Sequence, residues 1–142
     1  LNCLIDHPEG KKVAVKMGSY GIGVSRLVGA IIEAKFSNEV MKWPKSVSPY
    51  DVVIIPSINK NNTESFEKSD KIYRDLKKNG IDVLLDDVNE NISAKFKKHD
   101  LLGIPFQIII GSKSESDKFE FKEVGQEAIM LSLKEIKEKL KK

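Results

Sequence analysis

Cysteine and histidine are scarce in this sequence of 142 residues. The one cysteine, Cys3, excludes an internal disulfide, and together with His7 and His99 it makes none of the spacings that hold zinc. We therefore expect no metal site, a reducing, cytoplasmic setting, and a small hydrophobic role for the Cys3 side chain.

Long apolar runs and a first methionine are absent as well. No stretch of about 18 apolar residues occurs, which excludes a transmembrane helix and predicts no membrane partner. No basic segment precedes Leu1, so a signal peptide is not expected, and the missing methionine indicates a piece of a longer protein.

Arginine is rare, because only Arg26 and Arg74 occur among the 24 basic residues. The net charge of +3 is too small to indicate nucleic-acid binding by itself. Lysines near the end of the chain supply much of the positive excess. They alternate with Glu135 and Glu138, a pattern that is typical of a solvated helix face.

From residue 51 onward the sequence has the pattern of an α/β domain. Residues 52–55 form a continuous apolar run, typical of a strand that is buried on both faces. Ser132 and Glu135 form a capping box, which begins a final helix. Further strands are predicted at 81–85, 105–110, 118–124 and 128–131, and further helices at 63–79 and 94–102. These elements predict a mixed five-stranded sheet with flanking helices, in which residues 118–124 form an antiparallel edge strand.

The part before residue 51 has a different pattern. Residues 13–17 predict a strand, the glycines around Gly21 a turn, and residues 24–35 a helix. The apolar face of this helix has too little around it to be covered, so its partners are missing or lie in the second part. We divide the chain into residues 1–36, an irregular linker at 37–50, and the α/β domain at 51–142.

Parallel strands of such sheets bind ligands beyond their carboxyl ends, near the point where the strand order reverses. Here those ends are residues 57–60 and 86–90. Gln107 is a polar residue within the third apolar strand of the domain. We expect it to satisfy a neighbouring polar group rather than to contact a ligand.

The turn before Arg26 has several interpretations. A dinucleotide-binding turn requires a third glycine where Arg26 stands, and a second strand where a Trp–Pro linker follows instead. In the first turn of a helix a cation opposes the helix dipole by roughly 0.3–1 kcal/mol. Arg26 and the free N–H groups of that turn favour an anion such as phosphate, but Arg26 can also point to solvent at little cost. Spacing alone leaves these two interpretations open.

A family resemblance covers nearly the whole chain. Residues 17–27, followed by 30–33, resemble motif 3 of class II aminoacyl-tRNA synthetases in its bacterial prolyl form. The passage into that family's anticodon-binding domain and the domain itself are similar to residues 43–44, 48–56, 86–87, 95–96, 100–105 and 110–111. The resemblance implies a C-terminal fragment, in which a strand–helix remnant of the catalytic domain precedes the anticodon-binding domain.

The resemblance also implies a role for the first part. Arg26 would be the motif 3 arginine, which holds the terminal phosphate of ATP while prolyl-adenylate forms, and Gly21 and Gly23 would let the backbone approach the nucleotide. The implied cofactor is ATP with Mg²⁺, the implied partners are proline and tRNA(Pro), and the implied parent is a homodimer. Motifs 1 and 2 are not in this chain. We therefore expect no ATP–pyrophosphate exchange by the chain alone, and no cofactor for the anticodon-binding domain alone.

For the second part, the resemblance implies recognition of the proline anticodon. Single-stranded bases are read by stacking and by hydrogen bonds to their edges, and guanine requires both acceptors and cationic donors. The residues that offer this mixture near the second strand end are Asp87, Asn89, Glu90, Lys95 and Lys97. For each of them a solvated loop or a helix cap is the alternative. Two cations that are common in the family are absent, because Val88 and residues 91–93 stand where arginines are usual.

The sequence thus predicts tRNA anticodon recognition within a proline–tRNA ligase. The alternative is a stand-alone RNA- or nucleotide-binding module that uses the same fold without catalysis. Synthetases for threonine, histidine and glycine share the domain type, but the Trp–Pro linker and the motif 3 residues favour the prolyl enzyme. The lack of a cysteine cluster after the last helix favours the bacterial-type branch. In-frame motifs 1 and 2 upstream would decide between a ligase and a separate module.

Overall fold

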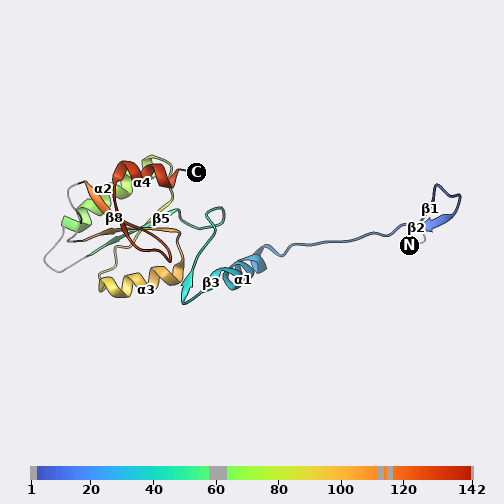
Figure 1. The fold of residues 1–142 in the computed structure, drawn as a ribbon, viewed down its shortest axis with the longest axis horizontal. Coiled ribbons are helices and arrows are strands. Elements are labelled where there is room, and N and C mark those ends of the chain that lie inside the picture. The colour runs from blue at the N-terminus through green and yellow to red at the C-terminus, as the bar shows by residue number, and fades with distance from the viewer. Residues whose placement is uncertain (1–2, 58–63, 112–113, 115–116, 142) are drawn as a thin grey trace.

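The computed structural model describes residues 3–57, 64–111, 114 and 117–141. In Figure 1 the N-terminal residues form an extended arm with one helix, and the rest of the described chain forms a layered domain. Of the two predicted strand ends, residues 58–60 lie outside the described residues. No helix in the described ranges is long and apolar enough to cross a membrane.

A mixed sheet of five strands is the centre of the layered domain, in the order β6-β5-β7-β8-β9. The strands are β5 (Val52–Pro56), β6 (Val83–Leu85), β7 (Phe106–Ile110), β8 (Lys118–Glu123) and β9 (Ile129–Ser132). β5 pairs in parallel with β6 and β7, whereas β8 runs antiparallel to β7 and β9. The predicted fold class is therefore confirmed.

The prediction that β8 is an edge strand is wrong. β9 pairs along it, from Phe121 opposite Ile129 to Lys118 opposite Ser132, so the edges of the sheet are β6 and β9. Phe119 and Phe121 are buried, while the residues between them are partly exposed. The alternation of apolar and polar residues in β8 thus indicates a strand that is covered on one face. It does not indicate a strand at the edge of the sheet.

Helices cover both faces of the sheet. α2 (Glu64–Lys78) and α4 (Leu133–Leu140) lie on one face, and α3 (Ile92–Leu102) lies on the other (Figure 1). Because side chains alternate along a strand, β5 contributes Val52 and Ile54 to one apolar cluster, and Val53 and Ile55 to a second cluster under α3. This two-sided burial is the reason that β5 is apolar throughout.

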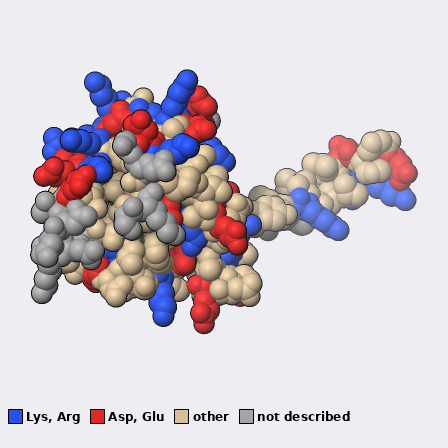
Figure 2. All heavy atoms as spheres, turned by 60° about the vertical axis from the view of Figure 1, so that its left-hand side comes forward, with Lys and Arg blue, Asp and Glu red and all other residues tan. Residues whose placement is uncertain are grey.

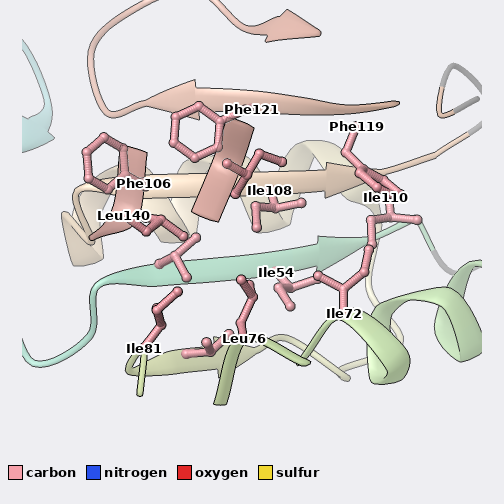
Figure 3. Close-up of a cluster of buried hydrophobic side chains, with 13 residues drawn as sticks. Ile54, Ile72, Leu76, Ile81, Phe106, Ile108, Ile110, Phe119, Phe121 and Leu140 are labelled. Atoms are coloured by element: carbon pink, nitrogen blue, oxygen red, sulfur yellow. The ribbon is translucent and has the colours of Figure 1, made fainter. Parts of the chain in front are cut away.

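The larger apolar cluster fills the space between the sheet and the helices α2 and α4 (Figure 3). Ile72 and Leu76 of α2 lie against Ile54 of β5 in this view. The rings of Phe106 and Phe121 stack with their centroids 5.3 Å apart. Burial of apolar surface stabilises by about 25 cal/mol per Å², so this cluster holds the strands, and with them their carboxyl ends, in fixed positions.

Polar caps set where two helices begin. The Asn91 side chain accepts the backbone N–H of Ser93 at 3.0 Å, and this cap starts α3 at Ile92 rather than at the predicted residue 94. The predicted capping box is confirmed. Ser132 Oγ accepts the Glu135 N–H at 3.4 Å, and Glu135 Oε2 accepts the Ser132 N–H at 2.8 Å.

The extended arm begins with a hairpin of β1 (Leu4–Asp6) and β2 (Lys12–Ala14). The strand predicted at residues 13–17 is therefore wrong in its extent, and β1 was not predicted. Val15 still donates its N–H to the carbonyl of Cys3 at 3.0 Å, but the described chain offers no strand beside residues 16 and 17. A strand ends where its backbone groups lose their partners.

The helix α1 (Val24–Lys35) matches the predicted helix, and none of its residues is buried. Its apolar residues Leu27, Val28 and Ile32 are exposed. Figure 1 shows α1 outside the layers of the sheet. We predicted that the partners of this apolar face are missing or lie in the second part, and within the described chain the second part does not cover it.

The segment predicted as an irregular linker also contains a short hairpin of β3 (Phe36–Ser37) and β4 (Val40–Met41). Its turn residues, Asn38 and Glu39, have φ values of 51° and 63°, as a two-residue hairpin turn requires. Strands of two residues are too short to show periodicity in the sequence. Trp43 fixes the segment to the end of α3, because its Nε1 donates to the Leu102 carbonyl at 3.0 Å.

Candidate functional site

The loop between β6 and α3 lies at the carboxyl end of the edge strand β6, beside the central strand β5. β5 lies between β6 and β7, and the chain leaves β5 toward α2 but leaves β6 toward α3, on opposite faces of the sheet. Connections that diverge in this way leave open space beyond the strand ends. Residues 87–91 of the loop are all exposed there.

Lys95 of α3 is fully buried beneath this loop. Its Nζ donates to the carbonyl of Asp86 at 2.9 Å and to that of Pro56 at 3.3 Å, and it lies 3.6 Å from Asp86 Oδ1. Burial lowers the pKa of Lys95, and the charge of Asp86 opposes that effect. The ammonium group thus ties the carboxyl ends of β5 and β6 to α3, which gives a buried lysine the partners that it requires.

Asp86 is the centre of this polar cluster and is also buried. Its Oδ2 lies 2.7 Å from His99 Nε2 and 2.9 Å from Lys98 Nζ, and its Oδ1 accepts the N–H of Val88 at 3.2 Å. Burial alone would raise the pKa of Asp86, but the hydrogen bonds from Lys98 and His99 and the charge of Lys95 together lower it to about 2. Asp86 is therefore ionised, and its carboxylate joins the loop to α3.

His99 contributes a neutral ring to the cluster. The side chain is 1% exposed, and burial lowers its pKa although the bond to Asp86 opposes that shift. A neutral ring that donates from Nε2 to Asp86 leaves Nδ1 without a proton. Nδ1 is buried and has no hydrogen-bond partner among the described residues, so a second proton there would have no acceptor.

The predicted contact residues fall into three places. Asp87, Asn89 and Glu90 are exposed together on the loop. Lys95 has no exposed surface, so it cannot touch a ligand unless the packing opens. Lys97 lines a separate hollow of about 590 Å³ between α3 and the β3–β4 hairpin. The structure thus brings the three loop residues together and leaves both lysines away from them, and a contact role for each residue stays a prediction.

Sequence reasoning missed Lys98 and His99, and it included Asp86 only within the strand end 86–90 without naming it as a site residue. Asp86 directly follows the last residue of β6, where polar groups of parallel sheets gather. Lys98 and His99 follow Lys95 by three and four positions, a spacing that places all three on one side of a helix. That spacing was the available signal, but it gives no indication of which of these side chains is buried.

Gln107 behaves as the sequence indicated. Its side chain is buried, and its Nε2 donates to Asp100 Oδ1 at 3.2 Å. The same oxygen accepts from Lys122 Nζ at 3.2 Å. Gln107 therefore joins β7 to α3, and Asp100 in turn joins α3 to β8 through Lys122, so Gln107 has a structural role.

The glycine turn and Arg26 lie in the extended arm. Arg26 is exposed in the first turn of α1, and Gly23 is the N-cap residue of that helix. A Cβ atom at Gly21 would meet nothing within 4 Å. The described residues around Gly21 and Arg26 therefore do not enclose a nucleotide, and we derive no ATP chemistry from them. Their predicted role in ATP binding stays a prediction.

Charge and metal chemistry give no further site. On the face shown in Figure 2, basic and acidic side chains are interspersed, so recognition there depends on individual groups rather than on a field of one sign. Within the described residues, no group of three or more His, Cys, Asp or Glu side chains is arranged to hold a metal ion.

Comparison with known proteins identifies the layered domain. Residues 51–142 match the family model described as anticodon binding domain. The chain is 54% identical to the proline–tRNA ligase of Pelagibacter ubique (strain HTCC1062) over 138 aligned residues. These residues make up 96% of this chain and 31% of that protein.

Two further relatives carry the same name. The proline–tRNA ligase of Parvibaculum lavamentivorans is 46% identical over 113 residues, which is 80% of this chain and 26% of that protein. That of Caldicellulosiruptor bescii is 39% identical over 121 residues, which is 85% of this chain and 21% of that protein. The chain thus spans less than a third of the length of each of these curated relatives.

Proposed function

The chain belongs to the anticodon binding domain family, and on that premise we propose that it binds tRNA and recognises the anticodon of a proline tRNA. The main support for this proposal is that Asp87, Asn89 and Glu90 are all exposed on one loop. It lies at the carboxyl end of β6, beside β5, and sheets of this kind bind ligands beyond the carboxyl ends of their parallel strands.

The chemistry of the loop suits the edges of unpaired bases. Carboxylate and amide oxygens of Asp87, Asn89 and Glu90 accept hydrogen bonds from the N–H groups of a guanine, and the amide of Asn89 can also donate. The buried bonds of Lys95 and Asp86 hold both ends of the loop, so little ordering is required when RNA binds. Lys97 lies apart, and we propose for it a contact with another part of the tRNA.

The whole protein would be a proline–tRNA ligase, the name that the similar proteins carry. It would be a cytoplasmic homodimer that joins proline to tRNA(Pro) with ATP and Mg²⁺. Arg26, Gly21 and Gly23 would contribute to its ATP site, together with residues that the described chain does not contain. We expect no ATP–pyrophosphate exchange from this chain alone, and no cofactor for the anticodon-binding domain alone.

An NMR titration of the ¹⁵N-labelled chain with a proline anticodon stem-loop tests the proposed site. We predict that the amide resonances of residues 87–91 and of the first turn of α3 shift. Resonances of α4, on the other face of the sheet, should stay unchanged and serve as the internal control. Shifts confined to α4 or β9 would contradict the proposed site.

A further inference from the structure

The loop after β6 has no cation of its own. Residues 86–91 supply three carboxylates and two amides together with Val88. A guanine presents acceptors at O6 and N7 as well as donors, and it is read best by a cation next to an acceptor. Residues 86–91 therefore supply acceptors for a guanine edge but no cationic donor.

Lys98 of α3 brings a cation to this loop. Its Nζ lies 2.9 Å from Oδ2 of the buried Asp86 and 3.4 Å from Oε2 of the exposed Glu90, on either side of residues 87–89. The side chain is 37% exposed, in contrast to Lys95, which is fully buried. Lys98 can therefore keep its bond to Asp86 and still reach a ligand with its remaining N–H groups.

A shallow hollow of about 300 Å³ lies beside Lys98. Its apolar walls include Leu84, Val88 and Leu102, and the latter two are exposed. Asp87 and Lys98 line the same hollow. Apolar walls suit the face of an unstacked base, while a carboxylate and an ammonium group suit its edge.

We propose that this hollow receives one unstacked base of the tRNA anticodon, that Lys98 donates to the edge of that base, and that Asp86 positions Lys98. The proposal rests on the proposed function, since it assigns a base-contacting residue to the site that recognises the anticodon. A purely structural ion pair between Lys98 and Asp86 requires no partly exposed ammonium group. Such a pair also requires no hollow with apolar walls.

Substitution of Lys98 tests the proposal. K98Q removes the charge but keeps the length of the side chain, K98R keeps the charge, and K139Q removes an exposed lysine from α4 as the matched control. Binding of each variant is measured with a tRNA that has a proline anticodon and with one whose anticodon is swapped. We expect K98Q to lose about tenfold in affinity for the first tRNA. Its affinity for the swapped tRNA and its thermal midpoint should change little, and K98R and K139Q should bind like the wild type.

The wild-type comparison separates this proposal from the proposed function. If the wild type discriminates between the two tRNAs and K98Q discriminates equally well, the role of Lys98 is refuted while anticodon recognition stands. If the wild type does not discriminate, both are refuted. An equal loss in K139Q would also refute a specific role, because it would indicate general attraction to phosphate.

A double-mutant cycle tests whether Asp86 acts through Lys98. D86N should weaken binding of the proline tRNA in the wild type but should add no further loss in the K98Q background. A merely structural role of Asp86 predicts the same loss of binding in both backgrounds. That result would overturn the positioning role.

Discussion

One buried carboxylate, that of Asp86, joins three cationic or hydrogen-bonding side chains in this protein. A buried charge is costly unless it is paired and hydrogen-bonded. Here Lys95, Lys98 and His99 supply the partners, and Val88 adds a backbone N–H. The cluster is therefore a fixed support for the exposed loop.

Acid titration should reveal this cluster in two steps. The pKa of His99 is lowered from 6.5, so the unfolded chain takes up a proton near that pH while the folded ring, next to Asp86, Lys95 and Lys98, stays neutral. Stability is thus present above pH 6.5 and declines below it. The pKa of Asp86 falls from 3.8 to about 2, so about 2 kcal/mol of stability is present above pH 3.8 and is lost as the pH approaches 2.

Urea unfolding as a function of pH measures both steps. We predict that H99Q removes the decline below pH 6.5, because the variant has no ring to protonate, and that D86N removes the decline between pH 4 and pH 2. Glu67 is an exposed carboxylate of α2, away from this cluster, so E67Q serves as the control for general acid effects. A wild-type profile that H99Q leaves unchanged would contradict a buried neutral ring.

For these individual residues, the sequence predicted where polar groups gather but not which of them are buried. The strand-end rule identified residues 86–90, and a resemblance identified Lys95. Nothing in the local pattern indicates that Lys95 points inward while Lys98, one turn along the same helix, reaches the loop. Burial of these side chains follows from how α3 packs on β5 and β6, which is tertiary information.

Among the elements, the close contact between β4 and the end of α3 fixes the linker to the domain. Gly103 ends α3 with a φ of 70°, and a Cβ atom there would lie 2.6 Å from both Cγ and the carbonyl oxygen of Met41. Met41 is buried at this contact. Only glycine satisfies both the left-handed backbone and the close approach.

Replacement of two glycines measures this contact. Gly80 has a φ of 76°, but a Cβ atom there would meet nothing within 4 Å, so G80A isolates the backbone cost, roughly 1 kcal/mol. We predict that G103A costs about 2 kcal/mol more, because Met41 must move as well. Chemical denaturation of both variants gives the difference. Equal losses would show that the linker does not pack against α3 as described.

The elements that the sequence predicted are those with a strong local signal. β5 is a continuous apolar run, and α4 begins at a capping box. The hairpins β1–β2 and β3–β4 were not predicted as hairpins, because a prediction for residues 13–17 covered only part of β2 and the other three strands gave no pattern that we recognised. The sequence predicted that the chain turns after β8 and returns as a fifth strand. We did not infer from it that this fifth strand, β9, forms the edge of the sheet in place of β8.

For the whole molecule, the described structure has one packed domain and an arm whose apolar helix face is uncovered. The chain spans 31% or less of the three proline–tRNA ligases compared above. The packed domain is the part of the chain that matches the anticodon binding domain family, whereas an ATP-binding role of Arg26 stays a prediction. This division explains why the fold could be predicted from local patterns, whereas a catalytic site could not be assembled from them.

The most direct test of anticodon recognition is a competition between two RNA stem-loops that differ only in their anticodon. Both are titrated against the 142-residue chain at one salt concentration, because phosphate contacts depend on salt. We predict that the proline anticodon binds at least about tenfold more tightly, as one or two good base contacts provide. Equal affinity for the two stem-loops would contradict anticodon recognition by this domain.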